Sequence, residues 1–340
     1  MDDKGVKTKD ITSSHGLFDK SIQNLKLISD ADVKRMVTMK KAVGLMKEAF
    51  SSFSRGSSYV PQRYVSSFPG ISLDIFFKPV YCSELGQICM KVLTQKNAHF
   101  ERNKPTIQGI VLLFDSETRE ILALIDGTYL TALRTGAASG IATRYLAQEG
   151  AETVAIFGCG AQGRTQLEAM CAVRPVKRAM LFDLEPIACE QLKAELCPKL
   201  GIEIDIENDT KVLKEADIIC TATNSESPLF SKDDIKEGVH INAIGSYKPH
   251  MQEIAPAILK SSKIFVDSSD AVLAESGDLI KPVAEGILSV QSIHAEIGNL
   301  ISGEATGRQS AEETTVFKSV GLAVQDLYVA NEVYKMSLTR

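Results

Sequence analysis

The chain has 340 residues, 44% of them hydrophobic and 24% charged, which is ordinary for a globular protein and excludes fibrous and disordered classes. This length exceeds that of a usual single core and therefore predicts two domains. A formal net charge of -5 without a long basic block argues against nucleic acid as the main partner.

Membrane and metal classes are also disfavoured. No apolar run is long enough to span a bilayer, and the acidic start "MDDKGVKTKD" lacks the pattern of a secretory signal, so we expect a cytoplasmic protein without a membrane partner. The 7 cysteines show no C-x-x-C spacing and the 5 histidines are dispersed. We therefore expect reduced thiols and no metal site.

The first half of the chain predicts a mixed α and β domain. Residues 1–24 form a polar arm, "LKLIS" a short strand, and Ser29 an N-cap before a helix whose apolar positions run from Met39 to Phe53 and which stops near Gly56. The segments "CMKVLTQ", "QGIVLLFD" and "EILALID" predict a sheet with a hairpin. A helix rich in small residues follows, "GTYLTALRTGAASGIATRYLA".

The second half alternates strand and helix. Its predicted strands are "TVAIFG", "RAMLFD", "IEIDI", "DIICTAT", "VHINAIG" and "KIFVDSS", and helices are expected at Arg164–Val173 and Leu184–Leu196. This rhythm is typical of an α/β fold with a doubly wound parallel sheet. A last helix, about Val316 to Lys335, is expected to return to the first domain.

A dinucleotide site is predicted at the first βα junction of that half. Gly158, Gly160 and Gly163 have the G-x-G-x-x-G spacing between an apolar strand and a helix, whose N-terminus can bind a pyrophosphate. Asp183 ends the next strand, where its carboxylate would accept bonds from ribose hydroxyls and repel a 2′-phosphate. NAD is therefore favoured, although Arg164 could reach the same region and leaves NADP open.

Two further strand ends would flank the nicotinamide. Thr221 and Thr223 end the fourth strand, and Ala243, Ile244 and Gly245 end the fifth. Ligands of open α/β sheets cross the carboxyl ends of the strands. Thr223 is either a direct contact or a strand-end turn residue.

Three cations of the first domain stand in apolar sequence: Arg63 in "VPQRYV", Lys91 in "ICMKVLT" and Arg134 in "LTALRTG". A buried charge needs either an internal acid or an anionic ligand. Three such residues in a domain that faces a nicotinamide predict a substrate carboxylate, which arginine can hold with charge-assisted bonds.

These segments together resemble the ornithine cyclodeaminase/mu-crystallin family. The resemblance rests on "KVLTQ", "LIDGTYLTALRTGAASGIAT", "FGCGAQGR", "HINAIGS", "ESGD" and "TTVFKSVGLAVQD", and it runs from about Leu25 to Tyr334. It implies a homodimer with a Rossmann domain, residues 146–310, inserted into a smaller α+β dimerisation and substrate domain, residues 25–145 plus 311–340.

The resemblance also implies roles for single residues. Arg63, Lys91 and Arg134 would hold an amino-acid carboxylate, and Lys91 would also border the reacting nitrogen. The remaining implied positions contact the cofactor: Gly109, Ala161, Gln162, Asp183, Thr223, Ala243 to Gly245 and Ser319.

Two departures from the family pattern shift the expected reaction. Ornithine cyclodeaminases have an Asp after the strand-end glycines, where this chain has Tyr247, and the position of a second acid falls near Phe76 in "DIFFKP". The chain therefore lacks the base expected for cyclising ornithine.

The leading hypothesis is an NAD-dependent imine reductase or amino-acid dehydrogenase. It would interconvert a 2-imino acid, linear or cyclic such as pyrroline-2-carboxylate, with an L-amino acid by hydride transfer. Tyr247 or His250 would relay a proton to or from solvent, or Tyr247 would only shape the pocket wall. The alternatives are an ornithine cyclodeaminase, which releases ammonia and proline, and a non-catalytic dinucleotide-binding protein of the mu-crystallin type.

Overall fold

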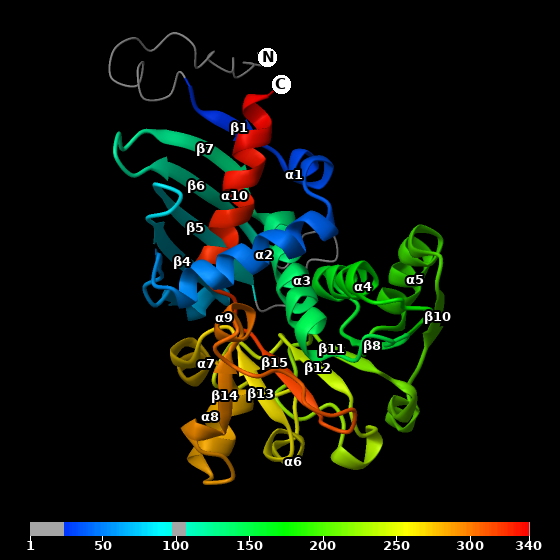
Figure 1. Cartoon of the computed structure of the whole chain (residues 1–340). Helices are drawn as coiled ribbons and strands as arrows, with labels where there is room; N and C mark the ends of the chain where they lie inside the picture. Colours follow the sequence, from blue (N-terminus) through cyan, green and yellow to red (C-terminus); the bar gives the residue numbers. More distant parts are fainter. Residues whose placement is uncertain (1–23, 97–106, 340) are drawn as a thin grey trace.

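The computed structural model describes residues 24–96 and 107–339, so nearly all of the predicted arm 1–24 lies outside the described residues. Two β-sheets organise these residues, and the long helix α3 (Gly127–Leu146) runs between them (Figure 1). The predicted combination of a mixed α and β region with a doubly wound parallel sheet is confirmed.

The first sheet has seven strands in the order β1-β7-β6-β5-β4-β2, with β3 paired to β4. Only β1 is parallel to its neighbour, and the other pairs are antiparallel. The predicted hairpin is the β6–β7 pair, whereas β4 was not predicted as a strand. The bounds are β1 Lys26–Ile28, β2 Ser58–Tyr59, β3 Tyr64–Phe68, β4 Leu73–Cys82, β5 Gln87–Lys96, β6 Ile107–Asp115 and β7 Ile121–Asp126.

Helices cover one face of this sheet. Ser29 does cap a helix, but that helix, α1 (Asp30–Met36), ends before Thr38, which caps a separate helix α2 (Met39–Ser54). The predicted apolar positions of α2 face the core, and α10 (Ala323–Leu338) packs beside α2 across the sheet (Figure 1). A domain built from both ends of the chain results.

The second sheet has eight strands, all parallel, in the order β10-β9-β8-β11-β12-β15-β13-β14. Its first five strands follow the Rossmann order 3-2-1-4-5. The bounds are β8 Thr153–Phe157, β9 Arg178–Phe182, β10 Glu203–Ile206, β11 Ile218–Thr221, β12 His240–Ala243, β13 Lys263–Val266, β14 Ile293–Glu296 and β15 Thr315–Lys318.

Apolar clusters lie on both faces of the second sheet, as expected for a parallel sheet covered by helices. The helices that follow these strands along the chain are α4 Ala161–Val173, α5 Pro186–Leu200, α6 Pro256–Lys260, α7 Ser269–Glu275, α8 Gly277–Ala284 and α9 Ile297–Ser302, with 3₁₀ turns η3 Thr210–Glu215, η4 Lys232–Asp234 and η5 Val290–Ser292. A further 3₁₀ turn, η2 Pro69–Ile71, connects β3 and β4 of the first sheet. In the described part of the chain, no helix combines the length and apolar character that a membrane crossing requires.

The C-terminal segment corrects one prediction. The expected helix from Val316 is wrong at its start, because residues 315–318 form β15 between β12 and β13, and α10 begins only at Ala323. The predicted division at 311 therefore assigns the last strand of the second sheet to the wrong domain. The run "TVFKSVGLAV" reads as one apolar helix, but its buried Thr315–Lys318 part completes a sheet.

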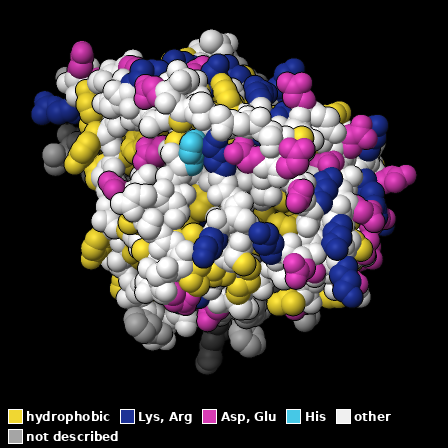
Figure 2. Space-filling view, turned by 60° about the horizontal axis from the view of Figure 1, so that its bottom comes forward, with side chains coloured by type: hydrophobic (Ala, Val, Ile, Leu, Met, Phe, Trp, Pro, Cys, Tyr) yellow, Lys and Arg dark blue, Asp and Glu magenta, His cyan; other side chains and the backbone are white. Residues whose placement is uncertain are grey.

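Charge is distributed without a dominant sign on the face that Figure 2 presents. Lys and Arg side chains lie there among Asp and Glu side chains, with apolar side chains between them. This face is therefore mixed rather than basic, unlike a surface built to bind a phosphate backbone.

Candidate active site

A cleft of about 300 Å³ lies between the two sheets. One wall comes from the first sheet and α3, and the other from the loops at the carboxyl ends of β8, β11, β12 and β15. The polar and glycine residues that line it are Arg63, Lys78, Gln95, Thr128, Thr131, Arg134, Thr135, Gly160, Gln162, Thr223, Asn224, Gly245, Tyr247, Ser319 and Gly321. The structure thus brings together the predicted cations and the predicted cofactor loops.

Arg63 and Arg134 line the cleft, as predicted for residues that meet a substrate. The Arg63 guanidinium pairs with Glu275 at 2.5 Å and donates to the carbonyl of Tyr247 at 3.0 Å. It also lies over the Phe76 ring, 5.4 Å from the centroid. Arg134 is 5% exposed and donates through Nε to Asp326 at 3.1 Å.

The structure does not bring Lys91 to the cleft wall, and its predicted contact with a substrate stays a prediction. Lys91 is 0% exposed and is not part of the cleft wall, because its ammonium binds the buried Asp326 at 2.7 Å and Thr131 Oγ1 at 3.4 Å. Burial lowers the pKa of Lys91 to about 8, although Asp326 opposes this shift. Lys91 is therefore a core residue beneath the cleft.

Lys78, which sequence reasoning missed, occupies the cleft wall instead. It lies directly opposite Lys91 in the β4–β5 register, and its Nζ donates to the carbonyl of Gly321 at 3.0 Å. Burial and the neighbouring Arg63 hold its pKa well below the usual value of 10.5. Its only sequence signal is the same as that of Lys91, a cation inside an alternating apolar strand.

The charges on this wall do not balance. Counted with both lysines protonated, Lys78, Lys91 and Arg134 carry three formal positive charges, and Asp326 supplies one negative charge to Lys91 and Arg134 together. Arg63 is balanced by Glu275. A formal excess of two positive charges therefore faces or underlies the cleft, which favours an anionic ligand.

Tyr247 and His250 lie in different places relative to the cleft. Tyr247 lines the cleft, its hydroxyl accepts a hydrogen bond from Gln95 Nε2, and burial raises its pKa. His250 is exposed and does not line the cleft, so it is not brought to the substrate side, and a proton relay by His250 to or from solvent stays a prediction. The chain turns outward at Pro249, directly after Tyr247 and Lys248.

The glycine loop has the geometry that a pyrophosphate needs. Gly158 has a φ of +90°, and a Cβ on Gly163 would lie 2.0 Å from the carbonyl oxygen of Gly158, so neither position admits a side chain. Gly160 is the N-cap of α4 and provides no side-chain cap, which leaves the first N–H groups of the helix for a ligand. Gly160, Ala161 and Gln162 line the cleft.

Asp183 is held toward this loop. Its Oδ2 accepts a hydrogen bond from the N–H of Cys159 at 2.6 Å, and its Oδ1 accepts one from the N–H of Glu185 at 2.9 Å. Arg164 is engaged by Glu195 and by the carbonyl of Cys159. The residue that left NADP open is therefore committed to other partners, and the loop fits NAD.

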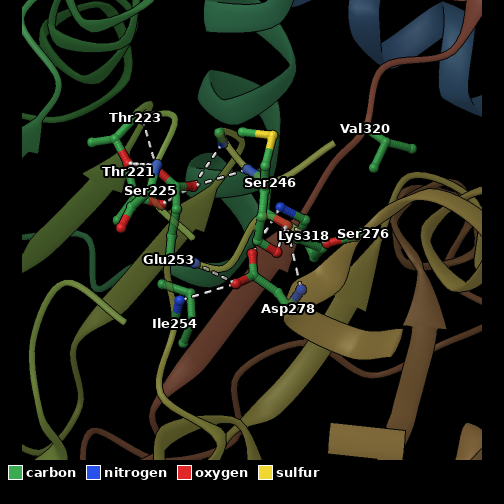
Figure 3. Close-up of polar contacts among 12 residues, drawn as sticks. Thr221, Thr223, Ser225, Ser246, Glu253, Ile254, Ser276, Asp278, Lys318 and Val320 are labelled. Atoms are coloured by element: carbon green, nitrogen blue, oxygen red, sulfur yellow. Dashed lines mark hydrogen bonds and ion pairs between the residues drawn. The ribbon is translucent and has the colours of Figure 1, made fainter. Parts of the chain in front are cut away.

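The nicotinamide rim is organised by a carboxylate that sequence reasoning did not assign. Thr223, Ile244 and Gly245 line the cleft as expected, whereas Ala243 is buried within β12 behind them. Glu253 accepts hydrogen bonds from the N–H groups of Thr223 and Gly245. Figure 3 shows it beside Thr223 and Ser246. An acid in the otherwise uncharged run "HMQEIAP" was its only signal.

Ser319 also lines the cleft, and Asp267 fixes it. Asp267 Oδ2 accepts hydrogen bonds from Ser319 Oγ at 2.7 Å and from the N–H groups of Val320 and Gly321 at 3.0 and 2.8 Å. Gly109, by contrast, does not line the cleft, so its predicted cofactor contact is not supported. A Cβ there would lie 2.5 Å from the carbonyl oxygen of Val92, so close strand packing explains this glycine.

A dinucleotide loop that faces a cationic wall defines a nicotinamide-dependent oxidoreductase acting on an anionic substrate. Residues 24–339 match the ornithine cyclodeaminase/mu-crystallin family. The chain belongs to this family, and the predicted membership is confirmed.

Relatives within the family share most of the chain. A Delta(1)-pyrroline-2-carboxylate reductase of Bacillus cereus is 40% identical over 316 residues, which cover 92% of this chain and 97% of the relative. The Thermococcus litoralis Delta(1)-pyrroline-2-carboxylate reductase, solved with NADH and L-proline, has a TM-score of 0.89 at 35% identity and covers 92% of this chain and 97% of its own. An archaeal alanine dehydrogenase dimer with bound NAD has a TM-score of 0.87 at 32% identity, covering 93% and 96%.

Proposed function

We propose that this protein is an NADH-dependent imine reductase that converts Δ1-pyrroline-2-carboxylate to L-proline. The observation that carries the proposal is the excess of two positive charges on the wall opposite the dinucleotide loop. A substrate carboxylate would neutralise part of it. The relatives named as reductases of this compound support the choice of substrate.

The walls around the cations suit a small apolar ring. Phe76, Leu93, Ile107 and Val320 line the cleft beside Lys78 and Arg134. Ring methylenes can contact these side chains while the carboxylate remains near the cations. Tyr247, in place of an acid, offers no base for an attacking amine, which disfavours cyclodeamination of ornithine.

The residues of the cleft wall orient the substrate and donate one proton to it. Bound NADH would supply the hydride, which adds to the imine carbon. Arg63 and Arg134 orient the carboxylate, so the C=N group faces the loops of the second sheet. Lys78 donates a proton to the nitrogen as the C=N bond is reduced to a secondary amine, and its lowered pKa makes it a stronger acid than an exposed lysine.

Lys78 can recover its proton from a second cavity. This cavity, about 400 Å³ in volume, lies on the other side of Arg63, Lys78 and Gly321, all of which line both spaces. Glu275 and Asp270 also line it. Proton return by this side would not require the product to leave first.

A direct assay tests the proposed activity. The protein is mixed with NADH and Δ1-pyrroline-2-carboxylate, absorbance at the dihydronicotinamide band is followed, and proline is quantified; we expect one proline per NADH consumed. Pyruvate with ammonia serves as the comparison substrate. Production of ammonia and proline from ornithine with catalytic NAD, without NADH consumption by the imine, would refute the proposal.

We also propose that the protein forms a homodimer through the uncovered face of the first sheet. Apolar side chains of neighbouring strands share this face, and four of them are well exposed: Leu27 73%, Tyr81 41%, Ile88 38% and Ile110 42%. Such a continuous apolar face suits a second copy. Light scattering should give a dimer for the wild type and a monomer for Ile88→Asp; a wild-type monomer would refute this.

A further inference from the structure

Glu253 is a buried carboxylate directly behind the nicotinamide rim. It is 0% exposed, and its Oε1 accepts hydrogen bonds from the N–H and the hydroxyl of Thr223 at 2.7 and 2.8 Å. Its Oε2 accepts bonds from Thr221 Oγ1 at 2.8 Å, Gly245 N at 2.7 Å and Ser246 N at 3.2 Å. One side chain thus ties together the ends of β11 and β12 (Figure 3).

The backbone donors among these contacts favour the ionised form of Glu253. The N–H groups of Thr223, Gly245 and Ser246 can only donate, and an ionised carboxylate only accepts. A protonated Glu253 would set its own O–H against these donors. Although burial raises its pKa, the surrounding donors therefore favour the carboxylate.

The neighbouring charges leave the cluster negative. Asp278 Oδ1 accepts bonds from the N–H groups of Glu253 and Ile254 at 2.7 and 3.0 Å, and its Oδ2 accepts one from Lys318 Nζ at 3.0 Å. Asp278 and Lys318 are 0% and 1% exposed. Two carboxylates and one ammonium give a formal charge of −1 that water screens poorly.

Gly245 and Thr223 lie between this charge and the cleft. An ideal Cβ on Gly245 would lie 2.3 Å from Glu253 Oε1, so the missing side chain of Gly245 points at the carboxylate while its backbone lines the cleft. A nicotinamide placed against Thr223 and Gly245 would sit in front of the cluster. Its ring carries a positive charge in NAD⁺ and none in NADH.

We propose that Glu253 is a positioning residue that also sets the relative affinity for the two cofactor forms, by presenting negative charge behind the nicotinamide rim. The cluster stabilises the oxidised pyridinium more than the neutral reduced ring. This inference rests on the proposed function, which places the nicotinamide at this rim. It concerns binding equilibria and is independent of which imine is reduced.

The test compares dissociation constants rather than turnover. Kd for NADH is measured by fluorescence and Kd for NAD⁺ by calorimetry, and the ratio Kd(NADH)/Kd(NAD⁺) is compared between the wild type and Glu253→Gln. We expect the ratio to fall at least about fivefold, the effect of a unit charge as far as about 15 Å away at an effective dielectric constant of about 20. An unchanged ratio in a folded variant would overturn the proposal.

A second variant separates charge from structural damage. Lys318→Met removes the cation and makes the cluster more negative, so the ratio should rise, opposite to Glu253→Gln. Loss of packing alone would not be expected to change the ratio in opposite directions in the two variants. If Glu253→Gln does not fold, the proposal is tested with Lys318→Met alone. A ratio Kd(NADH)/Kd(NAD⁺) in Lys318→Met that is equal to or lower than that of the wild type then overturns the proposal.

Asp217→Asn is the matched control. Asp217 also binds two backbone N–H groups, those of Glu152 and Thr153 at 2.8 and 2.9 Å, but it precedes β11 at the opposite end of the sheet. The ratio Kd(NADH)/Kd(NAD⁺) of Asp217→Asn should match that of the wild type. A decrease as large as that in Glu253→Gln would overturn the role assigned to Glu253. Absence of imine reduction with intact dinucleotide binding would instead count against the proposed function alone.

Discussion

The two walls of the cleft carry opposite charge. The wall from the first sheet holds Lys78 and Arg134 above Lys91, and Asp326 is the shared counter-ion of Arg134 and Lys91. The wall from the second sheet is backed by buried carboxylates, Glu253 and Asp267, whose bonds fix its loops. Each wall is thus suited to one partner, the cationic wall to a substrate carboxylate and the other to a nicotinamide.

Lys78 and Lys91 show the same contrast at the scale of single residues. They are opposite each other on β4 and β5, and both are buried. Lys91 has a carboxylate at 2.7 Å, whereas Lys78 donates to a backbone carbonyl and lines the cleft. The position of one remote acid therefore decides which lysine is available to a substrate.

Lys78→Met should produce the largest loss of activity. Removing the proposed acid should lower kcat/KM for the imine by roughly 100- to 1000-fold, within the range of general acid catalysis. NADH affinity, measured by fluorescence, should change little because Lys78 lies on the opposite wall. A variant that retained most of its kcat/KM would break the contrast between the two lysines.

Lys91→Met should mainly affect stability. It leaves the buried Asp326 with Arg134 alone, and breaking a buried ion pair costs about 3 kcal/mol or more. Urea unfolding of both variants should place Lys91→Met well below Lys78→Met in the free energy of unfolding. Equal stabilities, or a loss of kcat/KM as large as that of Lys78→Met, would contradict the assigned roles.

The pH dependence sharpens the assignment of Lys78. Its pKa lies well below 10.5, chiefly because of burial. In the proposed mechanism the protonated form of Lys78 donates the proton that accompanies hydride transfer to the imine. Therefore kcat/KM for reduction should be constant below this pKa and fall about tenfold per pH unit above it. Oxidation of proline needs the neutral amine of Lys78 as proton acceptor, so kcat/KM for oxidation should rise with pH over the same range. Identical pH profiles for reduction and oxidation would refute the role of Lys78 in proton transfer.

Tyr247→Phe should have the smallest effect. The Tyr247 hydroxyl accepts a hydrogen bond from Gln95. Its removal therefore costs the cleft wall one hydrogen bond, which contributes about 1 kcal/mol. We expect roughly a threefold to fivefold change in KM with kcat nearly unchanged. A loss of kcat as large as that of Lys78→Met would show that Tyr247 itself transfers the proton.

The second sheet was largely predictable because its signals are local. Each βα unit has its own apolar strand and helix, and the loop of Gly158, Gly160 and Gly163 is contiguous in sequence. Strand β15 was not predicted, because it joins the sheet out of chain order, between β12 and β13. In the sequence it also forms one continuous apolar run with α10. Nothing local separates a buried strand from a buried helix there.

The substrate wall was less predictable because its assignment depends on remote partners. Lys78 and Lys91 have equivalent strand contexts, and only Asp326, on the last helix, distinguishes them. His250 shared a promising segment with Tyr247, but the turn at Pro249 directs it outward. The sequence thus identified two cations of the cleft wall, Arg63 and Arg134, but not Lys78.

Transfer of label from the cofactor tests the central claim most directly. NADH deuterated at both C4 positions is incubated with the protein and Δ1-pyrroline-2-carboxylate, and the proline is analysed by mass spectrometry and proton magnetic resonance. We predict L-proline with one deuterium, bound to the α-carbon. Proline without deuterium, or NADH that remains unoxidised while ornithine yields ammonia and proline, would contradict the account.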